Sequence, residues 1–96
     1  MNSAILVVKI ITDPVHLNQN QHQILEIEVQ FATTLKKNFR NMLNLILWGD
    51  HRDDFLKYYK VHDYLVIEGI LTSKGYNGNE SELIIVAQRM YPLLLD

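Results

Sequence analysis

The segment from Leu43 to Leu71 constrains the fold of this chain more than any other part of its sequence. An apolar, alternating stretch ends in Trp48-Gly49, and a charged stretch of about ten residues with a helical pattern follows before a second apolar stretch begins. Apolar residues two apart favour a strand, whereas an apolar pair four apart, such as Phe55 and Tyr59, favours a helix. The segment therefore predicts a strand, a short helix and a strand that continues through Glu68-Gly69.

Apolar alternation in the rest of the chain predicts three more strands. Residues 4–12 are apolar on both faces except at Lys9, so we expect this strand to be covered on both sides before Asp13-Pro14 ends it. Residues 25–31 alternate apolar and polar side chains, as a strand with one buried face does. Residues 83–90 predict the last strand. Polar loops are expected at residues 18–23, 34–41 and 74–79.

The order of these elements predicts a fold class. Five short strands with one helix between the third and the fourth are typical of the OB-fold, a partly open, five-stranded Greek-key barrel. The chain has 96 residues, of which 48% are apolar, as expected for one globular domain. We therefore expect an all-β protein with a single OB-fold domain across residues 1–96 and no C-terminal tail domain.

Residue content and charge exclude several functions. The chain has no Cys, so it can form neither a disulfide nor a Cys-based zinc site. No apolar run approaches the roughly 20 residues that span a bilayer, and the N-terminus lacks the features of a signal peptide. We therefore expect an intracellular protein with no membrane partner. The net charge of −2 argues against avid binding of phosphates, because proteins that neutralise phosphates are usually basic.

The His and Asp residues form neither a metal-binding nor a catalytic pattern. The four His residues (16, 22, 51 and 62) lack the tight spacing of a zinc site. Asp50, Asp53 and Asp54 fit the first turn of a helix better than a cation site. We find no nucleophile elbow, Gly-rich phosphate loop or acid–base pair. We therefore expect no metal, no cofactor and no enzymatic activity.

Four short segments resemble, in order, the bacterial-type single-stranded-DNA-binding proteins (SSB family). The segments are Ile5–Val8 with Asp13-Pro14, Phe31–Thr33, Asn44–Gly49 and Tyr64–Leu71. The chain looks most similar to small SSB-like proteins of cyanobacterial and plastid type. The resemblance implies sequence-independent binding of single-stranded DNA or RNA, assembly as a homo-oligomer (dimer or tetramer), and a cytoplasmic or plastid-stromal location.

The resemblance also implies which residues contact nucleic acid. Proteins of this family stack bases on aromatic side chains and follow the phosphates with Lys and Arg. The matching aromatics are Trp48, Tyr76 and Phe39, and the matching cations are Lys36, Lys37, Arg40 and Lys74. Two features depart from the family pattern: Met42 stands where the family often has Trp, and Glu26 and Glu28 lie on the non-core face of their strand.

Each of these assignments has an alternative. Trp48 can pack under the helix or at a subunit interface, and the cations can form a solvated basic surface. The net charge, the two Glu residues and the apolar segment Leu93–Asp96 also fit an SSB-derived protein-interaction module with weak or no DNA binding, in which the C-terminal segment contacts a protein partner.

Overall fold

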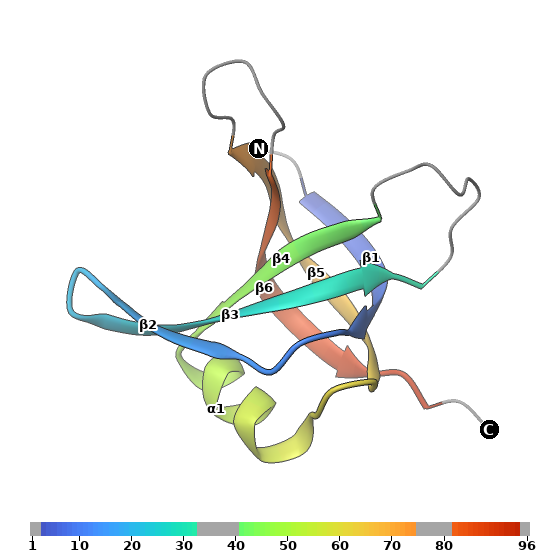
Figure 1. Ribbon diagram of the computed structural model, residues 1–96, viewed down its shortest axis with the longest axis horizontal. Helices are drawn as coiled ribbons and strands as arrows, with labels where there is room; N and C mark the ends of the chain where they lie inside the picture. Colours follow the sequence, from blue (N-terminus) through green and yellow to red (C-terminus); the bar gives the residue numbers. More distant parts are fainter. Residues whose placement is uncertain (1–2, 33–40, 75–81, 95–96) are drawn as a thin grey trace.

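The computed structural model describes residues 3–32, 41–74 and 82–94, and within them it contains six strands and one helix (Figure 1). In chain order the elements are β1 (Ser3–Ile10), β2 (Val15–Gln19), β3 (His22–Phe31), β4 (Met42–Trp48), α1 (Asp50–Tyr58), β5 (Tyr64–Lys74) and β6 (Glu82–Pro92). In these ranges no helix is long and apolar enough to cross a membrane.

Five of the strands close into a ring. The sheet order is β1-β5-β6-β4-β3, and β1 also pairs with β3 through the register Val8↔Phe31 to Ile10↔Val29, which joins the two ends. The pair β4–β6 is parallel, and the other pairs are antiparallel. Helix α1 connects β4 to β5 and packs against β4 and β6. This ring with its single helix confirms the predicted all-β OB-fold.

The core lies inside the ring because alternate side chains of each strand point inward. On β4, Leu43, Leu45 and Leu47 are buried, while the residues between them face outward. Phe55 of α1 is 1% exposed and stacks on Tyr59 with the ring centroids 5.7 Å apart. The apolar helical pair predicted from the sequence therefore attaches α1 to the barrel.

The predicted loop at residues 18–23 is wrong. These residues form the end of β2, a two-residue turn at Asn20-Gln21 and the start of β3, with Gln19 opposite His22 (Figure 1). Both turn residues have positive φ, 51° and 68°, as a tight hairpin turn requires. Val15 and Leu17 alternate with His16 and Asn18, but the apolar run is short and every side chain of β2 is exposed.

The expectation that the first strand is covered on both faces is also wrong for a single chain. Val8 and Ile10 are buried, but Ile5 is 70% exposed and Val7 is 39% exposed. The barrel therefore covers only the inward face of β1.

Candidate nucleic-acid interface

Trp48 is the last residue of β4 and faces away from the core. It alternates with Leu43, Leu45 and Leu47, which are buried, and its own side chain is 54% exposed. The next residue, Gly49, has a φ of 63° and turns the chain directly into α1. Because β4 ends at Trp48 and α1 begins two residues later, Trp48 lies at the rim of the barrel, between the outward face of the sheet and the start of the helix.

A small apolar surface, which we call the Trp48 platform, surrounds this side chain. Ile24 of β3 lies opposite Trp48 in the register, and Leu17 of β2 lies opposite Ile24. Leu17 is 37% exposed and Ile24 is half-buried. The His22 ring meets the Trp48 ring edge-to-face, with centroids 6.3 Å apart and an interplanar angle of 68°. The β2–β3 hairpin therefore extends the aromatic surface beyond the end of β4.

An open hollow of about 530 Å³ adjoins Trp48. It is lined by Trp48, Gly49, Asp50, His51, Ile70, Val86, Ala87 and Gln88. Its apolar residues lie together because Val86 of β6 is in register with Ile70 of β5 on one side and with Ile46 of β4 on the other. The His51 imidazole donates a hydrogen bond from Nε2 to the carbonyl oxygen of Gln88, at 2.8 Å. This bond ties α1 to β6 across the hollow.

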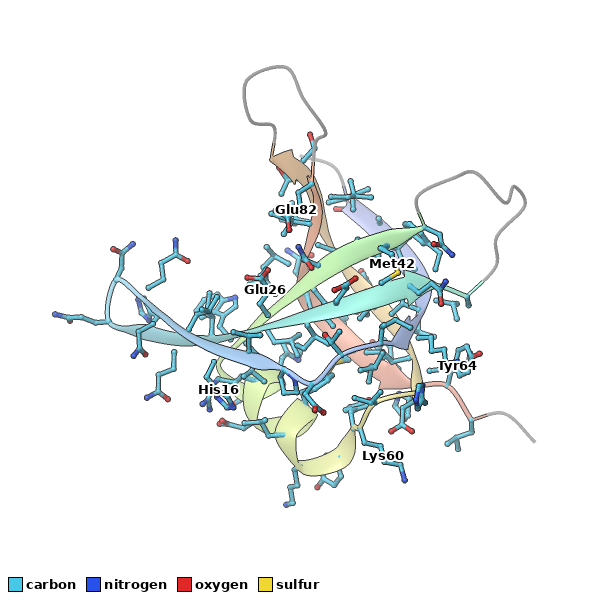
Figure 2. All side chains as sticks on the ribbon, in the orientation of Figure 1. His16, Glu26, Met42, Lys60, Tyr64 and Glu82 are labelled. Atoms are coloured by element: carbon cyan, nitrogen blue, oxygen red, sulfur yellow. The ribbon has the colours of Figure 1, made fainter. Side chains whose placement is uncertain are left out.

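Acidic residues border the outward face. Glu26 and Glu28 of β3 lie opposite Ile46 and Asn44 of β4. The Asn44 side-chain amide donates to the Glu82 carboxylate, and Figure 2 marks Glu26 and Glu82 on the ribbon. The residues that form the Trp48 platform and line the hollow include no Lys or Arg, and most of their side chains are apolar or aromatic.

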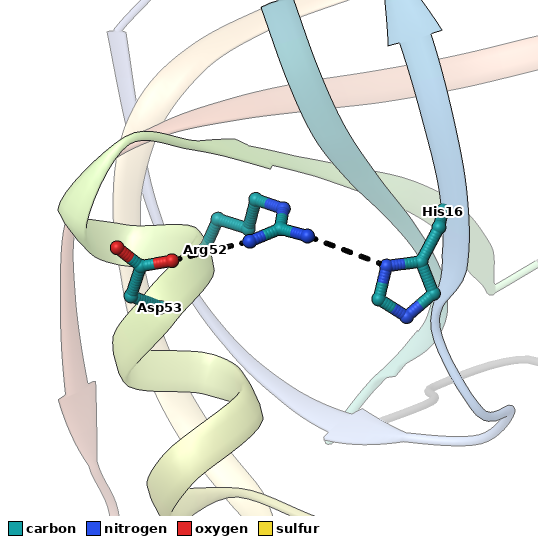
Figure 3. Close-up of polar contacts among 3 residues, drawn as sticks. All are labelled: His16, Arg52 and Asp53. Atoms are coloured by element: carbon teal, nitrogen blue, oxygen red, sulfur yellow. Dashed lines mark hydrogen bonds and ion pairs between the residues drawn. The ribbon is translucent and has the colours of Figure 1, made fainter.

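Arg52 connects the underside of the hairpin to the helix (Figure 3). Its Nη2 donates to His16 Nδ1 at 3.5 Å, and its Nη1 lies 3.2 Å from the Asp53 carboxylate. His16 lies opposite Leu25 in the register, on the face of β2 away from Leu17. The contact therefore supports the platform from behind and leaves its exposed face open.

The structure describes only part of the predicted site. Five of the predicted residues lie outside the described residues: Lys36, Lys37, Phe39, Arg40 and Tyr76. Lys74 is the last residue of β5. Met42 begins β4, at the opposite end of the strand from Trp48. The sequence reading missed His22, Ile24 and the hollow, because they come together only through strand pairing that has no local signal.

In residues 3–32, 41–74 and 82–94, no three His, Asp or Glu side chains lie close enough together to hold a metal ion.

Comparison with solved structures shows the class of protein. The SSB domain of a Synechococcus sp. protein matches with a TM-score of 0.75 and 25% identity over 95% of this chain and 94% of that chain. The second single-stranded-DNA-binding protein of Mycobacterium smegmatis matches with a TM-score of 0.77 and 20% identity over 96% and 86% of the two chains. These matches place the fold among the OB-folds of single-stranded-DNA-binding proteins.

Sequence comparison identifies the family. No protein-family model matches the chain. A protein of Trieres chinensis named "Putative single-stranded DNA-binding protein ycf41" is 31% identical over 104 aligned positions, which cover all of this chain and 92% of that protein. The chain therefore belongs to the single-stranded-DNA-binding protein family, as its sequence motifs predicted.

Proposed function

We propose that this protein binds single-stranded DNA without sequence preference and stacks bases on Trp48. The observation that carries the proposal is the outward position of Trp48, 54% exposed, on an apolar surface at the rim of an OB-fold. Stacking of one base on an aromatic side chain contributes about 1–3 kcal/mol and tolerates any base. The family relationship supports this assignment over packing of Trp48 under the helix, since Phe55 already occupies that position.

The remaining predicted contacts belong to the same proposal. Phe39 and Tyr76 supply further stacking surfaces, and the phosphates meet cations at Lys36, Lys37, Arg40 and Lys74. The chain as a whole carries a charge of −2, so its attraction to phosphates is weaker than that of a basic protein. Base stacking must therefore supply a larger share of its affinity for DNA. The proposed role is that of a binding protein and not of an enzyme.

A fluorescence titration tests the proposal directly, because Trp48 is the one Trp of the chain. Addition of oligo-dT at low salt should quench the Trp48 emission, and added salt should weaken the binding. An oligo-rU strand of the same length measures the choice between DNA and RNA. Absence of any quenching and of any binding at low salt would refute the proposal.

We also propose that the protein assembles with a second copy of itself through β1. Among the described residues, no strand pairs with the edge of Ser3–Leu6 that faces away from β5. Val7 of β1 is in register with Val66 of β5, and Val66 is in register with Tyr91 of β6. Tyr91 is 48% exposed. A free edge beside an exposed apolar surface is a site for strand pairing and burial.

Light scattering coupled to size exclusion tests this assembly. The protein should elute as a dimer or tetramer, and Ile5→Lys should shift it toward the monomer. Val15→Lys is the matched control, because Val15 is also an exposed apolar strand residue, 55% exposed, on another part of the barrel. An Ile5→Lys variant with the same mass in solution as the unmodified protein would contradict the β1 interface.

One set of observations favours a second function, a protein-interaction module. Glu26 and Glu28 repel phosphates, and Leu94 beyond β6 is 85% exposed. This alternative predicts a stable oligomer that does not bind oligo-dT at low salt, so the same titration separates the two functions.

We propose the plastid stroma as the compartment of this protein, because of its relationship to ycf41 of Trieres chinensis. Stromal fractions should then contain the protein.

A further inference from the structure

His22 is the residue of the Trp48 platform that can change its charge near neutral pH. It is exposed, and its ring meets the Trp48 ring edge-to-face with the centroids 6.3 Å apart. His is the side chain whose ordinary titration falls between pH 5 and 8, whereas Trp, Leu and Ile do not titrate. Lowering the pH from 7.5 to 5.5 therefore places a positive charge beside Trp48.

The β2–β3 hairpin holds the His22 side chain in this position. His22 is the first residue of β3 and pairs with Gln19 across the two-residue turn. Because side chains alternate along a strand, His22 shares the outward face of β3 with Ile24, which pairs with Trp48. Trp48 is 54% exposed with His22 in contact, so a large part of its surface remains open. A base on Trp48 and a charge on His22 are thus compatible.

The charged groups that share this face with His22 are acidic. Glu26 and Glu28 lie on the same outward face of β3, and α1 begins with Asp50 just beyond the end of β4. The outward side chains of β2 and β4 carry no charge. Arg52 of α1 contacts the opposite face of the hairpin. Protonation of His22 therefore offsets part of a negative local charge that repels phosphates.

We propose that protonated His22 holds a phosphate of the strand that stacks on Trp48, and that the protein therefore binds single-stranded DNA more tightly at pH 5.5 than at pH 7.5. This inference rests on the proposed function. A nucleotide carries its phosphate close to its base, and the two rings lie 6.3 Å apart. The charge of His22 thus acts on that phosphate within a Debye length, which is about 10 Å at 0.1 M salt.

The expected effect is modest and has a defined salt dependence. An exposed pair of opposite charges changes an equilibrium about 1.5- to 5-fold. We therefore expect oligo-dT to bind about 1.5- to 5-fold more tightly at pH 5.5 than at pH 7.5. One further phosphate neutralised on a single strand should also make the slope of log affinity against log salt concentration steeper by about 0.7.

The test measures the affinity for labelled oligo-dT by fluorescence anisotropy at both pH values over a range of salt concentrations. Neither thymine nor the phosphodiester titrates between these pH values. His22→Asn should lose the gain at pH 5.5 and the steeper salt dependence. His22→Lys, which carries a charge at both pH values, should bind at pH 7.5 as tightly as the unmodified protein binds at pH 5.5.

His62→Asn is the matched control. His62 is also exposed, and it lies in the turn that follows α1, at the other end of the helix from Trp48. Its φ of 81° is one that Asn tolerates better than most residues, so the substitution should not disturb the turn. The variant should keep both the gain at pH 5.5 and its salt dependence.

The outcomes distinguish this inference from the proposed function. An equal pH response in His22→Asn and in the unmodified protein overturns the inference and leaves the proposed function standing. Weaker binding at pH 5.5 that His22→Asn relieves also overturns it, because the imidazolium then covers the Trp48 face that the base needs. A protein that binds oligo-dT at neither pH overturns both. A gain that His22→Asn abolishes and His62→Asn preserves supports the inference.

Discussion

Replacement of Gly69 by Ala should destabilise the barrel strongly. Gly69 lies in β5 opposite Ala87 of β6, at a register irregularity that begins between Glu68 and Gly69. A Cβ added at this residue would collide with the backbone carbonyl oxygen of Val86, and it would lie 2.9 Å from the carbonyl carbon of Val86 and 3.1 Å from Cα of Ala87. All three atoms belong to the backbone, so no side-chain rotation relieves the contact.

The magnitude follows from what must move. Overpacking of a tight interior costs about 1–3 kcal/mol, and separation of β5 from β6 weakens ladder hydrogen bonds worth about 1 kcal/mol each. The lower entropy of the unfolded chain with Ala returns about 0.4–1 kcal/mol. The expected loss is about 2–4 kcal/mol, a large part of the roughly 5–15 kcal/mol that stabilises a domain.

Chemical denaturation followed by circular dichroism measures this loss, and a thermal scan should show a fall in Tm on the order of 10–25 °C. Gly49→Ala is the comparison variant, because nothing lies within 4 Å of its added Cβ and only the φ of 63° opposes the change. We expect it to cost about 1–2 kcal/mol. A Gly69→Ala variant as stable as the unmodified protein would refute the close β5–β6 approach and the wall of the hollow that depends on it.

Two further predictions concern charge and titration. The double variant Glu26→Gln, Glu28→Gln should bind oligo-dT several-fold more tightly at low salt, and the gain should shrink at high salt because screening removes the repulsion. An unchanged affinity would show that the bound oligo-dT lies away from β3. Burial raises the pKa of Tyr59, with smaller contributions from Asp54 and Asp63. The neutral phenol is thus favoured in the folded state, so its contribution to stability is complete below the ordinary Tyr pKa and is lost as pH rises through the raised value. Difference absorbance at alkaline pH, compared with Tyr59→Phe, should show one late-titrating Tyr; its absence would contradict the burial.

The ring of strands could be predicted from the sequence because buried apolar residues alternate with outward-facing residues along its strands. The Leu residues of β4 and the apolar pair Phe55 and Tyr59 carry strong periodic signals, and each lies where its period placed it. The outward position of Trp48 follows from the same alternation. Strand β2 carries only the short alternation of Val15 and Leu17. All five of its side chains are exposed, so the strand is held by its pairing with β3 and by the contact of His16 with Arg52, and not by the core.

The surroundings of Trp48 could not be predicted because they depend on long-range pairing. The parallel register of Ile46 with Val86 brings β6 beside β4, and these strands are far apart in the sequence. The bond from His51 to Gln88 likewise joins residues 37 positions apart. In this part of the barrel motif matching identified Trp48, whereas the hollow and the His22 contact required the assembled barrel.

The most direct test of the account measures the affinity of a labelled oligo-dT strand for the protein and for its Trp48→Ala and Trp48→Phe variants by fluorescence anisotropy. Because Trp48 is 54% exposed, neither substitution should greatly change folding. The account predicts that Trp48→Ala weakens binding about 5- to 150-fold, the equivalent of one stacked base, and that Trp48→Phe retains most of the affinity. Equal affinity for the strand in all three proteins would contradict the claim that Trp48 stacks a base.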